Sequence, residues 1–534
     1  HFNLDESWKT EFTIPNSKMV FNDDYLGYTI YQLDKPLAIG DSVLINIKNS
    51  YVTKGFGNGR GNTSIVNNGT FLNSFGVLPG FGYNSGVELS DKFDRKKYGL
   101  KPKKRTPDLE DPCGDHCMVN YLSDGVADWV NMETVISTSS DQVAIAPGSL
   151  VKEWTEGERR YFNYKVDHPS QLFLMFMSAE YEVARDKVND VDIEIYYDKK
   201  HDFNIDKMID AVRRSIAYYE ANFGKYYHKQ ARIIEFPRYA TFAQAFPGTM
   251  PYSESFGFIT NLEDEEGNNV IDAVIAHEMA HQWWAHQEVS ADMQGGTMLT
   301  ESFSEYSSLM VMKNDLNDDM RMTKFLKYDY DRYLRGRTRE TQKEVPLYKV
   351  ENQGYIHYGK GSIVLYTLQD YIGEDRVNQA LKSFLEEYRY KEPPYPTSMD
   401  FLRHLEPLVP DSMKYLVDDL FKNITLYDYR LADAKMKEEN GQYAVTFEIE
   451  AQKMYADTLG NEAPAELHEW VDVGVFADED KEDLIDYKRI FIDNEMTEYT
   501  LLVDRKPLKA AIDPRRVVIE RVIKDNVKTI KENE

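Results

Sequence analysis

Residues 270–284 read Val-Ile-Asp-Ala-Val-Ile-Ala-His-Glu-Met-Ala-His-Gln-Trp-Trp, and the rest of the chain is interpreted from this stretch. The apolar residues have the spacing of a buried helix, and no Gly or Pro interrupts it before His281. On such a helix His277 and His281 are four residues apart, so both imidazoles project from one face and can bind one metal ion. The adjacent Glu278 can take a proton from a water molecule beside that metal and pass it to a leaving amine. The stretch therefore predicts metal-assisted amide hydrolysis.

A catalytic zinc site needs a third protein ligand and keeps its fourth position open. Downstream, residues 299–306 read Leu-Thr-Glu-Ser-Phe-Ser-Glu-Tyr, and Glu301 is the natural candidate. Glu305, one helical turn further on, is the competing ligand, although it can equally be an ordinary acid on a helix surface. Because a bare H-E-x-x-H occurs by chance in long proteins, the hypothesis depends on this downstream carboxylate.

Together these two stretches resemble the M1 (gluzincin) aminopeptidases, whose pattern is H-E-x-x-H-Q-W-W followed by a glutamate in a W-L-N-E-G-F-A-x-Y-like stretch. The resemblance implies a single Zn²⁺ per chain, held by His277, His281 and Glu301. It also implies that Glu278 acts first as general base and then as general acid.

Residues 358–361, Tyr-Gly-Lys-Gly, are similar to the Y-x-K-G of the same family. By this resemblance the hydroxyl of Tyr358 stabilises the tetrahedral oxyanion, a role that a phenol beside a Lewis-acid metal can fill. The chain has 37 tyrosines, most of which must serve packing or the surface. The assignment of Tyr358 therefore depends on the family.

The spacing departs from the family pattern at one point. Nineteen residues separate His281 from Glu301, where the usual M1 pattern has one fewer. We expect the extra residue in the intervening loop, near Gly295 and Gly296, which leaves the helix that carries Glu301 in place. Thermolysin-like endopeptidases share the longer spacing, so that class remains the alternative.

The second departure concerns the family's G-x-M-E-N segment, which lines the substrate backbone and whose glutamate holds the free amino terminus. Residues 257–260, Gly-Phe-Ile-Thr, resemble the G-L-I-T that follows it, and they align residues 251–255, Pro-Tyr-Ser-Glu-Ser, with the motif. The alignment assigns Glu254 to the substrate amine. Pro251 replaces the glycine and lacks an N–H. We expect a strand edge near this segment and the metal helix to pair with an extended peptide.

Length and composition limit the functional classes. A chain of 534 residues with 42% hydrophobic residues can form several domains. The formal charge of −27 argues against nucleic acid and anionic membranes as partners, because a negative field repels both. The two cysteines, Cys113 and Cys117, suit a local disulfide or two free thiols, so they do not define the compartment.

The order of strand-like and helix-like patterns along the chain predicts a multidomain α+β protein. Strand-like runs such as residues 134–138 and 191–197 predict an N-terminal β domain over 1–200. The M1 resemblance implies that this domain is saddle-like, and that a thermolysin-like α/β zinc catalytic domain with a helical second half follows over 201–427. Strand patterns return afterwards, so a small C-terminal β-sandwich is expected over 428–534.

As a whole the chain resembles the M1-type domain joined to ABC-transporter permease-like membrane segments in some bacterial proteins. That resemblance implies a soluble, extracytoplasmic domain that is membrane-anchored in the full-length protein. No window of the sequence is long and apolar enough to cross a bilayer, and the first residues lack an initiating Met and a signal-peptide core. The leading hypothesis is a zinc aminopeptidase acting on peptides. The alternatives are a thermolysin-like endopeptidase and an inactive peptide-binding domain.

Overall fold

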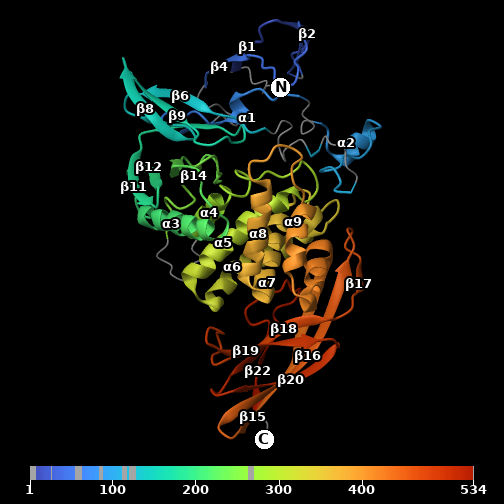
Figure 1. The fold of residues 1–534 in the computed structure, drawn as a ribbon. Coiled ribbons are helices and arrows are strands. Elements are labelled where there is room, and N and C mark those ends of the chain that lie inside the picture. The colour runs from blue at the N-terminus through green and yellow to red at the C-terminus, as the bar shows by residue number, and fades with distance from the viewer. Residues whose placement is uncertain are drawn as a thin grey trace. The chain divides into compact units, whose positions relative to one another are not determined.

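The computed structural model describes residues 8–25, 27–53, 63–82, 88–110, 117–118, 128–261 and 270–532. It is a mixed α+β protein with several sheets, whose elements are labelled in Figure 1. The chain divides into two compact units. The first comprises His1–Lys104, Ser123–Arg213 and Tyr226–Asn261, and the second comprises Arg105–Leu122, Arg214–Lys225 and Leu262–Glu534. The predicted three-domain boundaries stay a prediction.

The first unit is built mainly from antiparallel strands. Two pairs come from the start of the chain: β1 (Trp8–Thr13) with β4 (Asn46–Tyr51), and β2 (Ser17–Asp23) with β3 (Tyr28–Leu33). Two three-stranded sheets follow, with the orders β5 (Thr70–Asn73), β10 (Met175–Ala179), β7 (Val143–Ile145) and β6 (Glu133–Ser139), β9 (Arg159–Lys165), β8 (Ser149–Glu156). Two short helices are α1 (Ser74–Val77) and α2 (Lys92–Lys97).

A four-stranded sheet in the same unit has the order β11 (Glu182–Val188), β12 (Val191–Tyr197), β13 (Gln230–Phe236), β14 (Thr249–Ser253). β11 and β12 form an antiparallel hairpin, whereas β12, β13 and β14 are parallel. Every residue of β13 is buried, as expected for an apolar run between two parallel neighbours. Helix α3 (Ile205–Asn222) connects β12 to β13 along the chain.

The outward edge of β14 is already paired with the chain itself. Gln244 donates its backbone N–H to the carbonyl of Pro251 at 3.2 Å, and Ser253 donates to Phe242 at 3.0 Å. Phe246 and Thr249 exchange both of their backbone hydrogen bonds. Residues 242–246 occupy the outward hydrogen-bonding groups of β14, so this edge is not open to an extended peptide. The pairing of a substrate with a strand edge near the metal helix stays a prediction. The missing N–H of Pro251 is tolerated because it faces this irregular neighbour.

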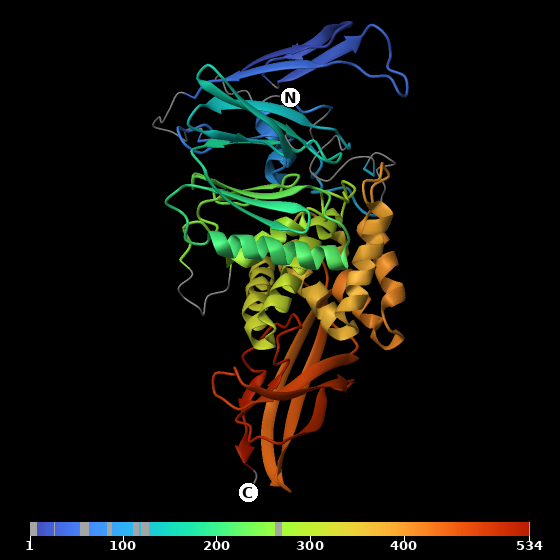
Figure 2. The ribbon, with the colours of Figure 1, turned by 60° about the vertical axis from the view of Figure 1, so that its left-hand side comes forward.

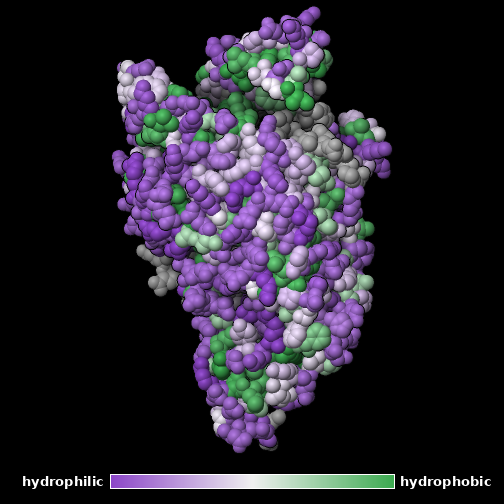
Figure 3. Space-filling model, viewed as in Figure 1, coloured by the Kyte–Doolittle hydropathy of each residue, from purple (hydrophilic) through white to green (hydrophobic). Residues whose placement is uncertain are grey.

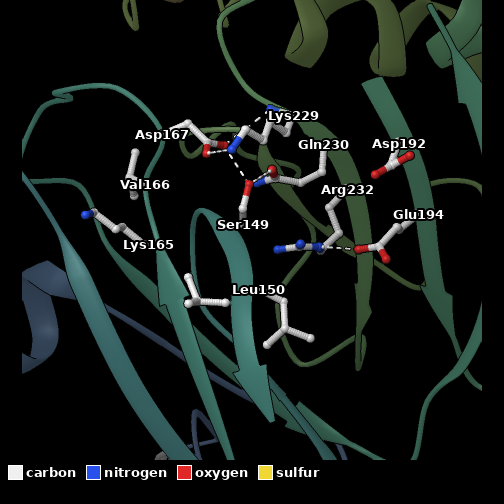
Figure 4. Close-up of a pocket in the computed structure, with 11 residues that line it drawn as sticks. Ser149, Leu150, Lys165, Val166, Asp167, Asp192, Glu194, Lys229, Gln230 and Arg232 are labelled. Carbon is white, nitrogen blue, oxygen red and sulfur yellow. Dashed lines mark hydrogen bonds and ion pairs between the residues drawn. The ribbon is translucent and has the colours of Figure 1, made fainter. Parts of the chain in front are cut away.

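The face drawn in Figure 3 is mostly hydrophilic, in keeping with the charge of the chain. Hydrophobic side chains gather over the N-terminal strands, where Met19, Phe21 and Ile30 are about half exposed. The first unit also contains a hollow of about 620 Å³, shown in Figure 4. There the buried Arg232 points at Glu194, 2.8 Å away, and Ser149 donates to Asp167. None of the described residues that line this hollow is a predicted site residue.

The second unit begins with helices. The longer ones are α4 (Val270–Ala280), α5 (Phe303–Leu316), α6 (Asp319–Arg337), α7 (Gly361–Ile372), α8 (Glu374–Tyr388) and α9 (Ser398–Leu405). Three π-helical turns interrupt the series: η3 (Met298–Ser302), η5 (Tyr355–Lys360) and η8 (Asp418–Lys422). Short helical turns are η4 (Leu347–Lys349), η6 (Glu406–Leu408), η7 (Asp411–Met413) and α10 (Tyr415–Val417).

The end of the second unit forms two sheets. In the first, the long strands β15 (Ile424–Glu439) and β16 (Gln442–Ala456) run side by side in both ribbon views (Figures 1 and 2). β17 (Glu462–Pro464) and β20 (Met496–Val503) pair with β16, and β23 (Lys531–Glu532) pairs with β15. The second sheet has the order β19 (Leu484–Ile492), β18 (Glu469–Phe476), β21 (Lys509–Ile512), β22 (Val527–Thr529).

The structure also bears on the predicted disulfide and on the predicted lack of a membrane-spanning segment. Cys117 is disulfide-bonded, which favours the disulfide over free thiols, whereas Cys113 lies outside the described residues. Among the helices of the described ranges, none combines the length and the hydrophobicity that a bilayer span requires.

Candidate metal centre

Helix α4 places the two histidines as the sequence predicts. The Nε2 atoms of His277 and His281 lie 3.1 Å apart. The Oε2 atom of Glu301 is 3.5 Å from the first of them and 3.4 Å from the second. The structure therefore brings all three predicted ligands together in the second unit.

The chemistry of this cluster fits a zinc ion. Oε2 of Glu301 is buried without a hydrogen-bond donor, although it faces two imidazole nitrogens. Nitrogen ligands at about 2.0–2.1 Å from a tetrahedral zinc are roughly 3.3 Å from each other, close to the spacing of the two histidines. His277, His281 and Glu301 would be the ligands and would leave the fourth position open.

Two tryptophans fix the C-terminal end of the metal helix. Both are fully buried. The indole N–H of Trp283 donates to the carbonyl of Gly224 at 2.8 Å, and that of Trp284 donates to the hydroxyl of Ser307 at 2.9 Å. Because buried indole groups need such partners, these bonds hold the turn that follows α4 in one position.

Glu301 lies in the π-helical turn η3, directly before α5. A π turn contains more residues than an α-helical turn, so it can take up a single extra residue without moving the helix that follows. The structure thus offers a place for the extra residue inside the helix rather than in the loop at Gly295. Position 295 needs a glycine for a separate reason: its φ is +86°, and a Cβ there would lie 2.4 Å from the carbonyl oxygen of Tyr348.

Glu305 makes a contact that neither interpretation of the sequence contains. Its Oε2 lies 2.5 Å from Nδ1 of His277, the ring nitrogen that faces away from the cluster. Nδ1 of His281 lies 2.9 Å from the carbonyl oxygen of Trp284 and 3.0 Å from the hydroxyl of Ser304. Such outer partners orient metal-binding imidazoles and raise their basicity. In the sequence, the four-residue spacing that puts Glu301 and Glu305 on one helix face was the feature that could have indicated that Glu305 lies near His277.

The carboxylates differ in charge state because their surroundings differ. Burial raises the pKa of Glu278, and the neighbouring histidines offset this only in part. Burial acts in the same direction on Glu301, but the contacts with His281 and His277 outweigh it and hold the pKa of Glu301 well below its usual value. These surroundings therefore favour the charged form of Glu301 and make Glu278 the more basic of the two.

Tyr358 lies beside the cluster in the π-helical turn η5. The centroid of its ring is 5.9 Å from that of His277. Burial and the nearby carboxylate of Glu301 raise the pKa of Tyr358 well above its usual value, so its hydroxyl remains a proton donor. This is the charge state that an oxyanion donor needs.

A hydrogen bond joins the two π turns. The hydroxyl of Ser302 in η3 donates to the carbonyl of His357 in η5 at 2.6 Å. The close approach requires Gly361, because a Cβ there would lie 2.1 Å from the Ser302 hydroxyl. Gly359 is equally constrained, since its Cβ would lie 2.9 Å from backbone atoms of α6. Gly361 thus lets the elements that carry Glu301 and Tyr358 approach each other, and Gly359 lets η5 pack against α6.

Glu254 lies in the first unit, directly after β14. One carboxylate oxygen accepts the backbone N–H of Arg238 at 3.2 Å. Its carboxylate gathers with His201 and Glu235, and the potential ligand atoms of the three all lie within 4.8 Å of one another. His201 forms a short ion pair with Glu235. The role of Glu254 as amine anchor stays a prediction.

Comparison with known proteins gives the class of the site. Residues 207–422 match the Peptidase family M1 domain, and this segment contains every predicted metal, catalytic and substrate residue. The chain therefore carries an M1 peptidase domain, the metallopeptidase class to which the His-Glu-x-x-His helix and the downstream glutamate point.

The curated relatives are aminopeptidases and an interacting factor of a protease. Probable aminopeptidase 2 of Sulfurisphaera tokodaii is 22% identical over 274 residues, which cover 50% of this chain and 34% of that protein. Tricorn protease-interacting factor F2 of Thermoplasma acidophilum is 23% identical over 287 residues, 52% of this chain and 35% of that protein. Endoplasmic reticulum aminopeptidase 2 of Homo sapiens is 25% identical over 190 residues, 34% of this chain and 20% of that protein. The chain thus spans about a third or less of these relatives.

Proposed function

We propose that this protein is a zinc-dependent aminopeptidase that removes amino-terminal residues from peptides. The observation that carries the proposal is the convergence of two imidazole nitrogens and one buried carboxylate oxygen within 3.5 Å of one another, next to the buried Glu278. An M1 domain match over this segment and relatives named aminopeptidases support the same activity.

In the proposed reaction the protein supplies a base, an acid and an oxyanion donor. A zinc ion on these ligands would supply Lewis-acid chemistry, by polarising the scissile carbonyl and lowering the pKa of the attacking water. Glu278, made more basic by burial, accepts the proton of that water and then delivers it to the leaving amine. The hydroxyl of Tyr358 donates a hydrogen bond to the oxyanion of the tetrahedral intermediate.

A comparison of peptides with free and acetylated amino termini, followed by mass spectrometry, tests the proposal. An aminopeptidase releases single residues from the free peptide and leaves the acetylated one intact. Internal cleavage of both at similar rates would instead support the thermolysin-like endopeptidase. Binding of peptides without any turnover would support an inactive peptide-binding domain, an alternative that the replacement of the motif's glycine by Pro251 makes specific.

The arrangement of domains belongs to the same proposal. We infer that residues 201–427 act as a thermolysin-like catalytic domain between a saddle-like β domain at 1–200 and a β-sandwich at 428–534. The two terminal sheets formed after Ile424 support the last of these. By resemblance to permease-associated M1 domains, the native protein is tethered to membrane segments and faces the extracytoplasmic side. Detection of the chain in the membrane fraction of its source cells, and its release by external protease, would test this placement.

A further inference from the structure

Arg332 of helix α6 lies over the ring of Tyr358, the predicted oxyanion donor. Its guanidinium carbon is 4.2 Å from the centroid of that ring, inside the distance of about 6 Å at which a cation and an aromatic face attract each other. Within the part of the chain that the structure describes, Arg332 forms no ion pair with a carboxylate, whereas Arg335 of the same helix forms one with Asp331 at 3.1 Å. Arg332 therefore uses its guanidinium group to stack on an aromatic ring, not to pair with an acid.

Close packing of the backbone brings the guanidinium and the ring together. Gly359 directly follows Tyr358 in η5. A Cβ on this glycine would lie 2.9 Å both from the carbonyl oxygen of Asp329 and from the amide nitrogen of Tyr333. These two groups flank Arg332 in α6, so the glycine lets η5 pack directly against the turn of the helix that carries the arginine.

Two further contacts act on the same region. The ring of His357, which is buried, packs edge-on against the ring of Tyr358, with 4.4 Å between the centroids and 77° between the planes. The hydroxyl of Ser362 donates to the buried carboxyl group of Asp329 at 3.0 Å and ties the start of α7 to α6. Because Tyr358 is itself partly exposed, its ring depends on such neighbours to keep one orientation.

An oxyanion donor depends strongly on its position. The donor atom must lie about 2.7–3.1 Å from the oxygen that becomes negative, and a displacement of about 1 Å in such a site can cost ~10²-fold in rate. A tyrosine places its hydroxyl through two rotatable side-chain bonds. A cation stacked on the face of the ring favours the rotamer that keeps the stack, so the hydroxyl is in position before a substrate binds.

We propose that Arg332 is a positioning residue, which stacks on Tyr358 and holds its hydroxyl at the place where the oxyanion forms. This inference rests on the proposed function, because it takes Tyr358 as the oxyanion donor. The attraction between a guanidinium group and an aromatic ring corresponds to a factor of about 2 to 30 in the population of the held orientation. Removal of the guanidinium group should lower turnover by a comparable factor.

The test combines Arg332→Met with Tyr358→Phe in a double-mutant cycle. Alone, Arg332→Met should lower kcat about 2- to 30-fold and leave KM unchanged, because the oxyanion donor acts in the transition state. In the Tyr358→Phe background the same substitution should have no further effect, since no hydroxyl is left to position. An equal decrease in both backgrounds would overturn the proposal, because it would show that Arg332 does not act through Tyr358.

Matched variants separate positioning from support of the fold. Arg332→Lys keeps the cation but loses the planar group that stacks, so its kcat should lie between those of the wild type and Arg332→Met. Arg335→Met removes an exposed arginine of the same helix and should leave kcat unchanged. Zinc content and denaturant unfolding, measured on every variant, identify any loss of the folded site. A rise in KM with unchanged kcat in Arg332→Met would overturn the proposal, since it would indicate a contact with the substrate instead.

Binding of a ligand that is not cleaved distinguishes this inference from the proposed function. A phosphinic dipeptide analogue has tetrahedral phosphorus in place of the scissile amide and imitates the intermediate. In calorimetric titrations of the zinc-loaded proteins, Arg332→Met should bind it about 2- to 30-fold more weakly than the wild type, with no further weakening when the substitution is added to Tyr358→Phe. This result would support the positioning role even if the wild type cleaves no peptide. Equal affinity of the wild type and Arg332→Met would overturn it even if the wild type is a good aminopeptidase.

Discussion

The candidate metal centre in the second unit and the edge of β14 in the first unit differ in what their hydrogen bonds achieve. In the metal centre, the irregular π turns η3 and η5 are joined through Ser302 and bring Glu301 and Tyr358 to their positions. At β14, pairing with residues 242–246 leaves little backbone free for a substrate. The side chains of the candidate site are thus assembled, while the edge of β14 is covered. A peptide substrate of the proposed enzyme would therefore need contacts other than strand addition at β14.

The largest expected effect is on the base in the metal centre. Glu278→Gln cannot accept the proton of the attacking water, so turnover should fall by ~10²–10⁴-fold. Zinc content should stay at the wild-type level, because Glu278 is not a ligand. Steady-state kinetics with parallel metal analysis checks both parts, and a variant with near-normal turnover would remove Glu278 from the mechanism.

Tyr358→Phe removes only the oxyanion donor. Loss of one such donor typically costs ~10²–10³-fold in turnover. Tyr355→Phe is a matched control, because Tyr355 lies in the same π turn but its hydroxyl donates to Glu340 at 3.0 Å. Comparable losses in both variants would indicate damage to the turn rather than a role for the Tyr358 hydroxyl.

A smaller effect is expected at the end of β14. If Glu254 holds the substrate amine, Glu254→Ala should reduce the preference for free over acetylated peptides by about tenfold, the low end of a charge-assisted contact. Glu235→Gln is the comparison, since Glu235 contacts the same His201 but has no assigned role in amine binding. An unchanged preference in Glu254→Ala would show that the resemblance at this segment does not extend to function.

The smallest effect is expected from the link between the π turns. Ser302→Ala leaves the carbonyl of His357 without its buried donor, which costs about 1–3 kcal/mol of stability. Turnover should fall severalfold, because Glu301 and Tyr358 lose their connection. Denaturant unfolding and kinetics on the same preparation check this, and unchanged values for both would show that the turns are positioned by packing alone.

The grouping of the two histidines could be predicted from the sequence because its geometry is local. Four residues on one helix place His277 and His281 together regardless of the rest of the fold. Tyr358 depended on family resemblance. Its approach to Glu301 requires Ser302 and Gly361 to join elements that are far apart in sequence. The second contact of His277, with Glu305, could not be predicted, because it depends on which partner the neighbouring helix supplies.

The covered edge of β14 could not be predicted, for a related reason. The sequence predicts a strand edge near this segment without locating it, and the structure has β14 there. Whether its outer edge is available depends on residues 242–246, which have no regular strand pattern and pair through isolated bridges. A strand can be predicted from its own sequence, whereas the availability of its edge depends on what the rest of the chain lays against it.

The central claim is that His277, His281 and Glu301 hold one catalytic zinc ion while Glu305 only orients His277. Zinc affinity, measured by competition with a chromophoric chelator, tests it most directly in the wild type, Glu301→Gln and Glu305→Gln. We predict about one zinc per chain in the wild type, loss of stable binding in Glu301→Gln, and a reduction of about 10- to 100-fold in affinity in Glu305→Gln. Wild-type affinity in Glu301→Gln together with loss of zinc in Glu305→Gln would contradict the account.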